Sequence, residues 1–182
     1  EKLHLLKEGK LKKSALVDSV IYKGDDNKYY EQVGKSDKEI TEEIAFDLPN
    51  GWSWCRLKDI CSIFTGATFK KEETVTTKEG VRILRGGNIS PFELRIKDDD
   101  IFLTKDKVKE DIILKENDIL TPAVTSLENI GKMVRVNSDM PNTTVGGFVF
   151  IIRLYLKNQW LSKYILYLLS SPFMIDFMKS IT

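Results

Sequence analysis

The chain has few of the residues that build metal sites and disulfide frameworks. Its 182 residues include two cysteines, Cys55 and Cys61, and one histidine, His4. A structural zinc site takes about four cysteine or histidine ligands, which this sequence cannot supply. No secretory signal pattern opens the chain, so we expect a cytoplasmic protein with two reduced thiols. The abrupt start, EKLHLLKEGK, indicates a piece of a longer protein.

Long apolar runs and catalytic motifs are also missing. The longest apolar stretch, 146–156, contains Arg153 and is shorter than the roughly 18 residues of a membrane span. The sequence has no Gly-x-Ser-x-Gly elbow, no phosphate-binding loop and no Asn-Pro-Pro-Tyr motif of adenine methyltransferases. Acidic pairs and triplets, at 72–73 and 98–100, have the polar context of solvated turns. We therefore predict no membrane partner, no metal site and no catalysis by this chain alone.

An excess of positive charge is lacking too. The chain carries 28 Lys+Arg and 27 Asp+Glu, a formal net charge of +1. Neutralisation of phosphates supplies most of the sequence-independent affinity of proteins for DNA. If the chain binds DNA, the charge predicts weak sequence-blind binding, with specificity coming from base edges or with help from a more basic partner.

What is present is the pattern of an α+β domain. Short apolar runs bounded by turn residues predict strands at 81–84, 101–103, 118–123, 130–136 and 147–156. Residues 52–57 alternate between apolar and polar side chains, as in a half-buried strand. Residues 57–64 fit a short helix or a continuation of that strand. An apolar helix is predicted at 160–169 and ends before Pro172, after which a second helix follows. We expect a compact domain with a mixed, twisted sheet and C-terminal helices.

Large aromatic side chains are interpreted as core residues, because aromatic rings bury large areas. They are Trp52, Trp54, Trp160, Tyr164, Tyr167 and Phe173.

The first 45 residues have a different character. Leu3, Leu6 and Leu11 recur at near-helical spacing, and a hairpin is predicted around the turn residues 24–27. The polar residues 34–43 are interpreted as linker. The sequence thus predicts a connecting arm at 1–45 and the domain proper at 46–182.

Polar and basic residues in the predicted loops are candidates for DNA contact. Lysine, serine and threonine typically hold phosphates, whereas arginine can bond guanine and asparagine can bond adenine in the major groove. The candidate residues are Lys70, Lys71, Arg82, Arg85, Asn88, Thr125, Ser126, Asn129 and Lys132.

Four blocks occur in an order that resembles one family. They read LPNGWSWCRLKDICSIFTGAT at 48–68, RILRGGNI at 82–89, ENDIL at 116–120 and NIGKMVRV at 129–136. Together they resemble a target-recognition domain of the specificity subunit of type I restriction-modification enzymes. The arm is similar to the passage from the spacer helix into the second, C-terminal recognition domain. A further C-terminal helix of that family would then be missing after Ile181.

The resemblance implies a fold similar to the DNA-binding domain of adenine-N6 methyltransferases. It implies binding of double-stranded DNA at one half of a bipartite target, without cofactor or catalysis in this chain. The implied partners are methyltransferase subunits, which would carry S-adenosylmethionine, and a restriction motor subunit. One departure is the loop 121–129, which has neither the arginine nor the glycine usual in the family.

Three other functions compete with this interpretation. Segment 160–178 could dock a partner helix in a protein-interaction module. The chain could be the recognition domain of a single-chain restriction-modification enzyme. The acidic cluster 98–100 could serve a stand-alone nuclease, which would show metal-dependent DNA cleavage.

Overall fold

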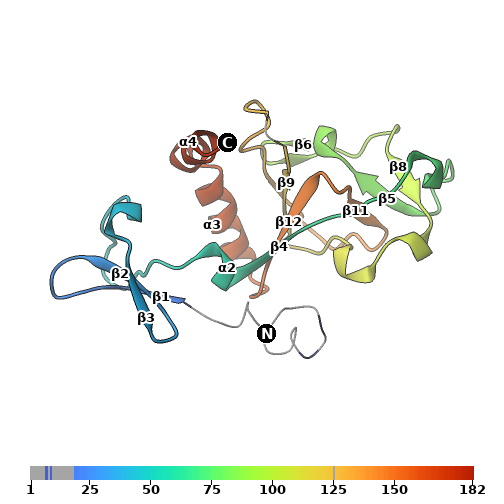
Figure 1. Cartoon of the computed structure of the whole chain (residues 1–182). Coiled ribbons are helices and arrows are strands. Elements are labelled where there is room, and N and C mark those ends of the chain that lie inside the picture. Colours follow the sequence, from blue (N-terminus) through green and yellow to red (C-terminus); the bar gives the residue numbers. More distant parts are fainter. Residues whose placement is uncertain (1–6, 8, 10–18, 125) are drawn as a thin grey trace. The chain divides into compact units, whose positions relative to one another are not determined.

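The computed structural model describes residues 7, 9, 19–124 and 126–182 (Figure 1). The helix end predicted around Leu3, Leu6 and Leu11 lies outside the described residues. The chain divides into two compact units, residues 1–61 and 62–182. Residues 46–61, which the sequence assigned to the domain proper, belong to the first of these units.

The first unit contains an antiparallel sheet with strand order β1-β2-β3. Its strands are β1 (Ser19–Lys23), β2 (Tyr29–Val33) and β3 (Ser36–Glu39). The turn between β1 and β2 closes through a hydrogen bond from Gly24 N to Lys28 O at 2.8 Å. Asn27 adopts a φ of 63° there, a conformation that asparagine tolerates better than most residues. The hairpin predicted from the sequence is confirmed.

The linker predicted at 34–43 is wrong. The segment forms β3 and a 3-10 helix, η2 (Thr41–Glu43), and Gly34 turns the chain at a φ of 63°. Every side chain of β3 is exposed. A strand that buries no side chain shows no apolar alternation in its sequence, which is why the pattern missed it.

Residues 44–60 of the first unit form no strand, and contacts between side chains hold them in place. Residues 52–56 form no strand and lead into a short helix, α2 (Leu57–Ile60), so the half-buried strand predicted at 52–57 is wrong. Trp54 packs against Phe46 with ring centroids 5.1 Å apart, but Trp52 is 56% exposed and is not the core residue that was predicted. Both cysteines are free, and burial raises the pKa of Cys61 to about 12.

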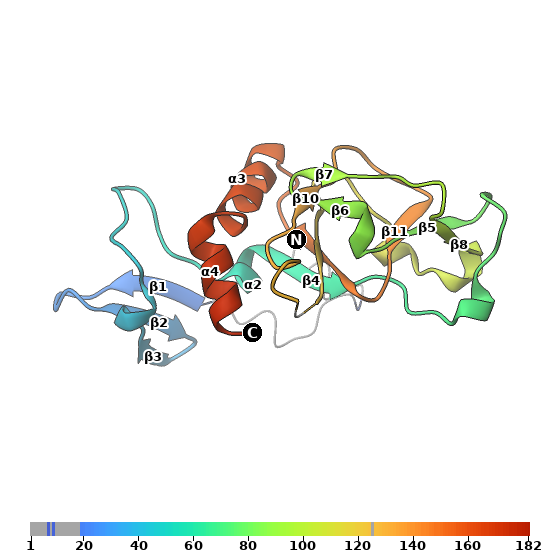
Figure 2. The ribbon, with the colours of Figure 1, turned by 90° about the horizontal axis from the view of Figure 1, so that it is seen from above.

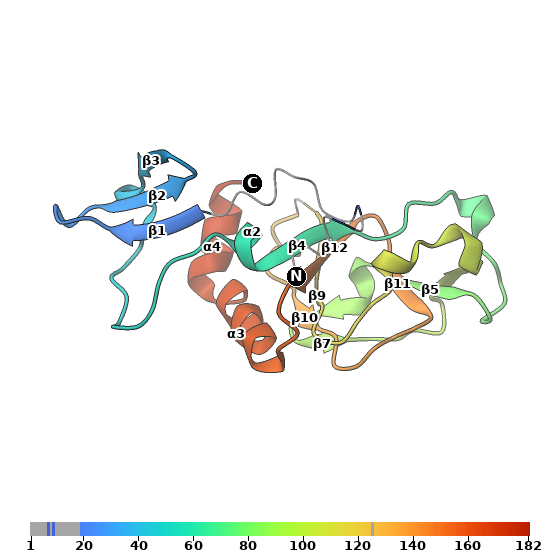
Figure 3. The ribbon, with the colours of Figure 1, turned by 90° about the horizontal axis from the view of Figure 1, so that it is seen from below.

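The second unit contains three small sheets (Figures 2 and 3). The first has the order β10-β9-β12-β4 and consists of β4 (Cys61–Thr65), β9 (Ile119–Pro122), β10 (Val134–Arg135) and β12 (Val149–Leu154). The second has the order β11-β5-β8 and consists of β5 (Val81–Leu84), β8 (Ile101–Leu103) and β11 (Thr143–Val145). The third is the hairpin of β6 (Ile89–Ser90) and β7 (Glu93–Leu94). Strands β11 and β5 are parallel, whereas the pairs β9–β12, β9–β10 and β5–β8 are antiparallel.

The core of this unit lies between the first two sheets. Leu84 of β5, Leu120 of β9, Val145 of β11 and Ile151 of β12 belong to one buried cluster. The strands predicted at 81–84, 101–103, 118–123 and 147–156 are confirmed with small changes of their ends. The strand predicted at 130–136 shortens to β10. Segment 57–64, predicted as a short helix or a continued strand, divides into α2 at 57–60 and β4 after it, whereas β6, β7 and β11 had not been predicted.

The two C-terminal helices are confirmed. Helix α3 (Gln159–Leu169) begins after Asn158, whose Oδ1 accepts from Trp160 N at 2.9 Å and from Leu161 N at 3.0 Å. Helix α4 (Pro172–Ser180) begins after Ser171, whose Oγ accepts from Met174 N. Such caps satisfy backbone donors that have no partner within the helix. The α+β class predicted from the sequence is therefore confirmed.

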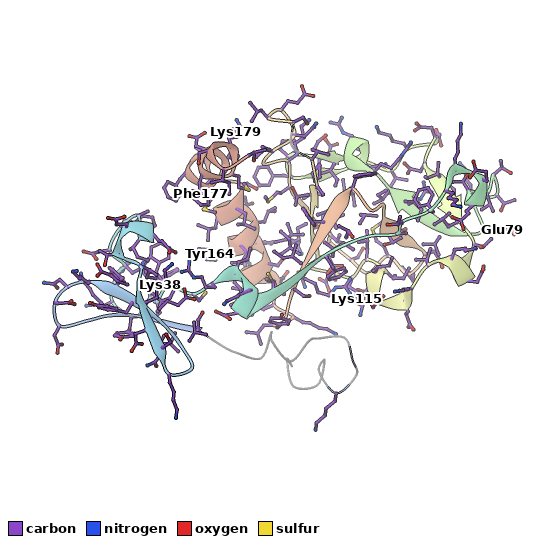
Figure 4. The ribbon with its side chains drawn as sticks, in the orientation of Figure 1. Lys38, Glu79, Lys115, Tyr164, Phe177 and Lys179 are labelled. Atoms are coloured by element: carbon purple, nitrogen blue, oxygen red, sulfur yellow. The ribbon has the colours of Figure 1, made fainter. Side chains whose placement is uncertain are left out.

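The aromatic residues of these helices correct the sequence prediction. Trp160 is 68% exposed, and Tyr164, Tyr167 and Phe173 are exposed as well. The buried side of α3 consists of Ser162, Ile165, Leu166 and Leu169. Figure 4 shows Tyr164 on α3, with Phe177 and Lys179 on α4. In the described part of the chain, no helix combines the length and the apolarity that a membrane crossing requires.

Candidate nucleic-acid interface

Arg82 and Asn88, two of the predicted contacts, meet at a buried carboxylate. Asp100 accepts hydrogen bonds from Arg82 Nη1 at 2.8 Å, from Asn88 Nδ2 at 2.6 Å and from Lys97 N at 2.9 Å. Burial alone would raise the pKa of Asp100, but the hydrogen bonds from Lys97, Asn88 and Arg82 outweigh it and lower that pKa. This network fixes the turn after β5.

Asn88 also sets the backbone of Arg85. Its Oδ1 accepts from Arg85 N at 2.8 Å, and its Nδ2 donates to Arg95 O at 2.8 Å. Asn88 is only 1% exposed, so its carboxamide is used inside the fold. The side chain of Arg85 is 48% exposed and lies beside Asp99 at 3.5 Å. Of the predicted residues around this turn, Arg85 is the one whose side chain is exposed.

A second group of predicted residues forms a chain of hydrogen bonds in the loop after β9. Lys132 Nζ donates to Asn129 Oδ1 at 2.7 Å, and Asn129 Nδ2 donates to Ser126 Oγ at 2.6 Å. Thr125, predicted in the same loop, lies outside the described residues. Gly131 has a φ of 85°, and a Cβ there would come within 2.6 Å of the Ile175 side chain on α4. The structure thus brings Ser126, Asn129 and Lys132 together, in a loop that packs against α4.

Lys70 and Lys71 lie elsewhere. Lys71 opens the 3-10 helix η3 (Lys71–Glu73), and Lys70 N donates to Glu73 Oε2 at 2.7 Å. The same glutamate accepts from Lys107 Nζ at 3.1 Å, which ties this turn to the segment after β8. Figures 1 and 2 show this turn and the loop 126–132 at separate places in the second unit. The structure therefore does not gather all the predicted lysines into one patch.

Four segments far apart in sequence converge at a feature that we call the loop edge, residues 65–68, 84–87, 122–124 and 146–148. Ala67 N donates to Val145 O, Gly146 N donates to Leu84 O, and Ala123 N donates to Phe148 O, each at 2.8 Å. A Cβ on Gly86 would lie 3.7 Å from Pro122. Arg85 belongs to this edge, and the loops that carry Lys70 and Ser126 continue from it.

Phe148 at the loop edge was not among the predicted site residues. It is 80% exposed, more than any other large apolar side chain in the described part of the chain. The signal that could have found it is a pair of glycines directly before an aromatic residue, since paired glycines mark a turn where backbones approach closely.

The acidic cluster 98–100 shows no metal-binding arrangement. Asp100 is taken up by Arg82 and Asn88, whereas Asp98 is exposed and lies 3.6 Å from Lys78. Across the described residues, no group of three or more His, Cys, Asp or Glu side chains could hold a metal ion.

The second unit is thus an α+β fold whose converging loops expose basic, polar and aromatic side chains. Its relatives were sought among known proteins. No family model matches the chain. The chain is 34% identical over 145 residues to the specificity subunit of the type I restriction enzyme EcoAI from Escherichia coli. It is therefore homologous to a type I restriction enzyme specificity subunit. The match covers 78% of this chain and 21% of that protein, so the chain spans about a fifth of the length of this curated relative.

One solved structure supports the fold. The HsdS subunit from Thermoanaerobacter tengcongensis superposes with a TM-score of 0.51 at 20% identity, over 72% of this chain and 31% of that chain. A chain from a structure on complex assembly and conformational transition of the type I R-M system gives a TM-score of 0.49 at 20% identity. That match covers 68% of this chain and 29% of the other.

Proposed function

We propose that this chain is a target-recognition domain of a type I specificity subunit and binds double-stranded DNA sequence-specifically. In this proposal residues 46–182 form the second, C-terminal recognition domain and read one half of a bipartite target. Residues 1–45 form the arm that leads into it. The observation that carries the proposal is the 34% identity to a specificity subunit over 78% of the chain.

In this proposal partner subunits, not this chain, carry out the chemical reactions. The chain fixes the register on DNA, and methyltransferase subunits that carry S-adenosylmethionine modify an adenine, which must leave the base stack to react. Motor subunits would add restriction. The whole assembly would act in the cytoplasm.

The predicted residues divide into two roles. Arg82 and Asn88 are held around buried Asp100, so we assign them to positioning the turn that presents Arg85. Arg85 is exposed, and its guanidinium suits a guanine edge. Lys132, whose Nζ donates to the amide oxygen of Asn129, suits a phosphate, as do the exposed Lys70 and Lys71.

Methylation mapping tests the proposal. The complete specificity subunit is purified with and without its methyltransferase subunit and incubated with unmodified DNA and S-adenosylmethionine, and modified adenines are located by sequencing. The proposal expects modification at one bipartite sequence with the partner present and none from the specificity subunit alone. Methylation by the isolated chain, or modification at random adenines by the complex, would refute it.

The exposed aromatic residues of α3 and α4 support a second candidate, a protein-docking role. Trp160, Tyr167 and Phe177 are all more than half exposed, and exposed apolar patches mark interaction sites. Substitution of all three residues by serine would then weaken binding of a partner subunit and leave DNA binding unchanged. The reverse result, loss of DNA binding with partner binding intact, would count against docking.

A further inference from the structure

We propose that Phe148 is a base-reading residue, whose ring enters the major groove of the target and contacts the methyl group of a thymine. This inference rests on the proposed function, because it deepens DNA recognition to one residue and one base. It starts from an unusual placement. Phe148 is 80% exposed at the tip of the turn between β11 and β12, where an aromatic ring gives up the burial that normally stabilises it.

The ring stands on a backbone that is tightly fixed. Phe148 O accepts from Ala123 N, and Val149 N donates to Gly146 O at 3.1 Å, which closes the turn on itself. A Cβ on Gly147 would come within 2.9 Å of Thr68 Oγ1. The tip is therefore pinned from the side of β9 and from the side of β4.

Close packing of Gly66 against Val145 also fixes the backbone just before this turn. A Cβ on Gly66 would lie 1.8 Å from Val145 O, so the two backbones are in direct contact. Ala67 and Gly146 form a parallel bridge at this place. A reading side chain must be held in place by its supporting structure, and this turn provides such support.

The surroundings of Phe148 suit a duplex better than a protein core. Arg85 is exposed on the same loop edge, and Lys97 Nζ lies 3.4 Å from the position of a Cβ on Gly87. In the proposed complex Lys97 would contact a phosphate and Arg85 a guanine edge, while the exposed apolar ring of Phe148 would face the bases. In the major groove the thymine methyl is the apolar feature that a phenylalanine can read.

Phe150 provides a matched control. It is the same residue type two positions along, lies within β12 opposite Thr121, and is 37% exposed. It stands on the strand rather than on the loop edge. A general loss of apolar surface or of stability would affect both variants, whereas base reading would affect Phe148 alone.

The experiment uses the complete specificity subunit bound to its methyltransferase subunit. The wild type, Phe148→Ala and Phe150→Ala are each allowed to select from a pool of duplexes of randomised sequence. Thermal unfolding of each complex verifies folding. We expect Phe148→Ala to lose the preference for thymine at one position of the selected site, with about tenfold weaker binding of that site. Phe150→Ala should select and bind like the wild type.

A second arm identifies the methyl group itself. In the site selected by the wild type, each thymine is replaced in turn by deoxyuridine, which lacks only that methyl. One replacement should weaken binding of the wild type several-fold and leave the binding of Phe148→Ala unchanged. An unaltered site preference in Phe148→Ala overturns the inference, as does an equal effect of every deoxyuridine on both proteins. A wild-type complex that selects no sequence overturns the proposed function as well, which separates the two failures.

Discussion

Arg153 of β12 and Asp118, which directly precedes β9, form a two-point ion pair. Arg153 Nε lies 2.8 Å from Asp118 Oδ1, and Arg153 Nη2 lies 2.7 Å from Asp118 Oδ2. The same guanidinium donates to the carbonyl oxygens of Asp111 and Ile113 and lies 5.2 Å from the ring of Phe64. One side chain thus ties three parts of the second unit together.

Removal of one partner of this pair should destabilise the fold. The side chain of Arg153 is only 20% exposed, and a buried charge that loses its partner keeps the cost of its desolvation. We expect Asp118→Ala to lower the free energy of unfolding by about 3 kcal/mol, measured by urea denaturation. Asp98→Ala is the control, because Asp98 is exposed and its contact with Lys78 is screened by water. Equal stabilities of the two variants would contradict the importance of the buried pair.

Arg82 and Arg85 should separate stability from binding. Arg82 bonds buried Asp100 and stacks 4.8 Å from the ring of Phe102, so Arg82→Ala should cost on the order of 2 kcal/mol in the free energy of unfolding. Arg85→Ala should keep the stability of the wild type and weaken binding of the target duplex about tenfold. Urea denaturation and a fluorescence binding titration of both variants measure the two effects. A loss of stability in Arg85→Ala alone would reverse the roles assigned to the two arginines.

The sequence predicted the parts of the fold that apolar pattern controls. β5, β9 and β12 are rich in buried aliphatic residues, and α3 has an apolar stripe, so these three strands and this helix were predicted. β3 was missed because its four residues are polar and exposed. β6, β7 and β11 were missed because each has only two or three residues and includes a polar one, unlike the equally short but wholly apolar β8. The exposure of Trp160 was missed for a different reason, since residue type predicts burial only on average.

The candidate site was predicted only in part. The sequence indicated the loops that carry Arg85 and Lys132, because turn residues mark loops wherever they pack. It could not show that Asn88 turns inward to Asp100, since that contact joins residues from different loops. Phe148 escaped notice because its glycine pair indicates only a turn, and the convergence of four separate segments at that turn is a property of the folded chain.

Acid should destabilise the first unit through one ion pair. Hydrogen bonds from Arg56 lower the pKa of Glu31 from 4.5 to about 2. Because the folded pKa is the lower one, the stabilisation is complete above 4.5 and is lost as the pH falls from about 4.5 towards 2. Over that window we expect a loss on the order of 3 kcal/mol, which denaturation at several pH values measures. Glu31→Gln should lack this part of the pH dependence, and an identical acid profile in both proteins would disprove the linkage.

The small net charge should make sequence-blind binding weak and only slightly dependent on salt. With a formal charge of +1, the chain has few cations in excess to replace counterions on DNA. If Lys70 and Lys71 each contact a phosphate, replacing both by alanine should reduce the slope of log K against log salt by about two. Lys179→Ala on α4 is the control and should leave the slope unchanged (Figure 4). A titration of non-target duplex at several salt concentrations measures the slopes. Tight binding at physiological salt would contradict the prediction and show that local clusters of cations outweigh the small net charge of the chain.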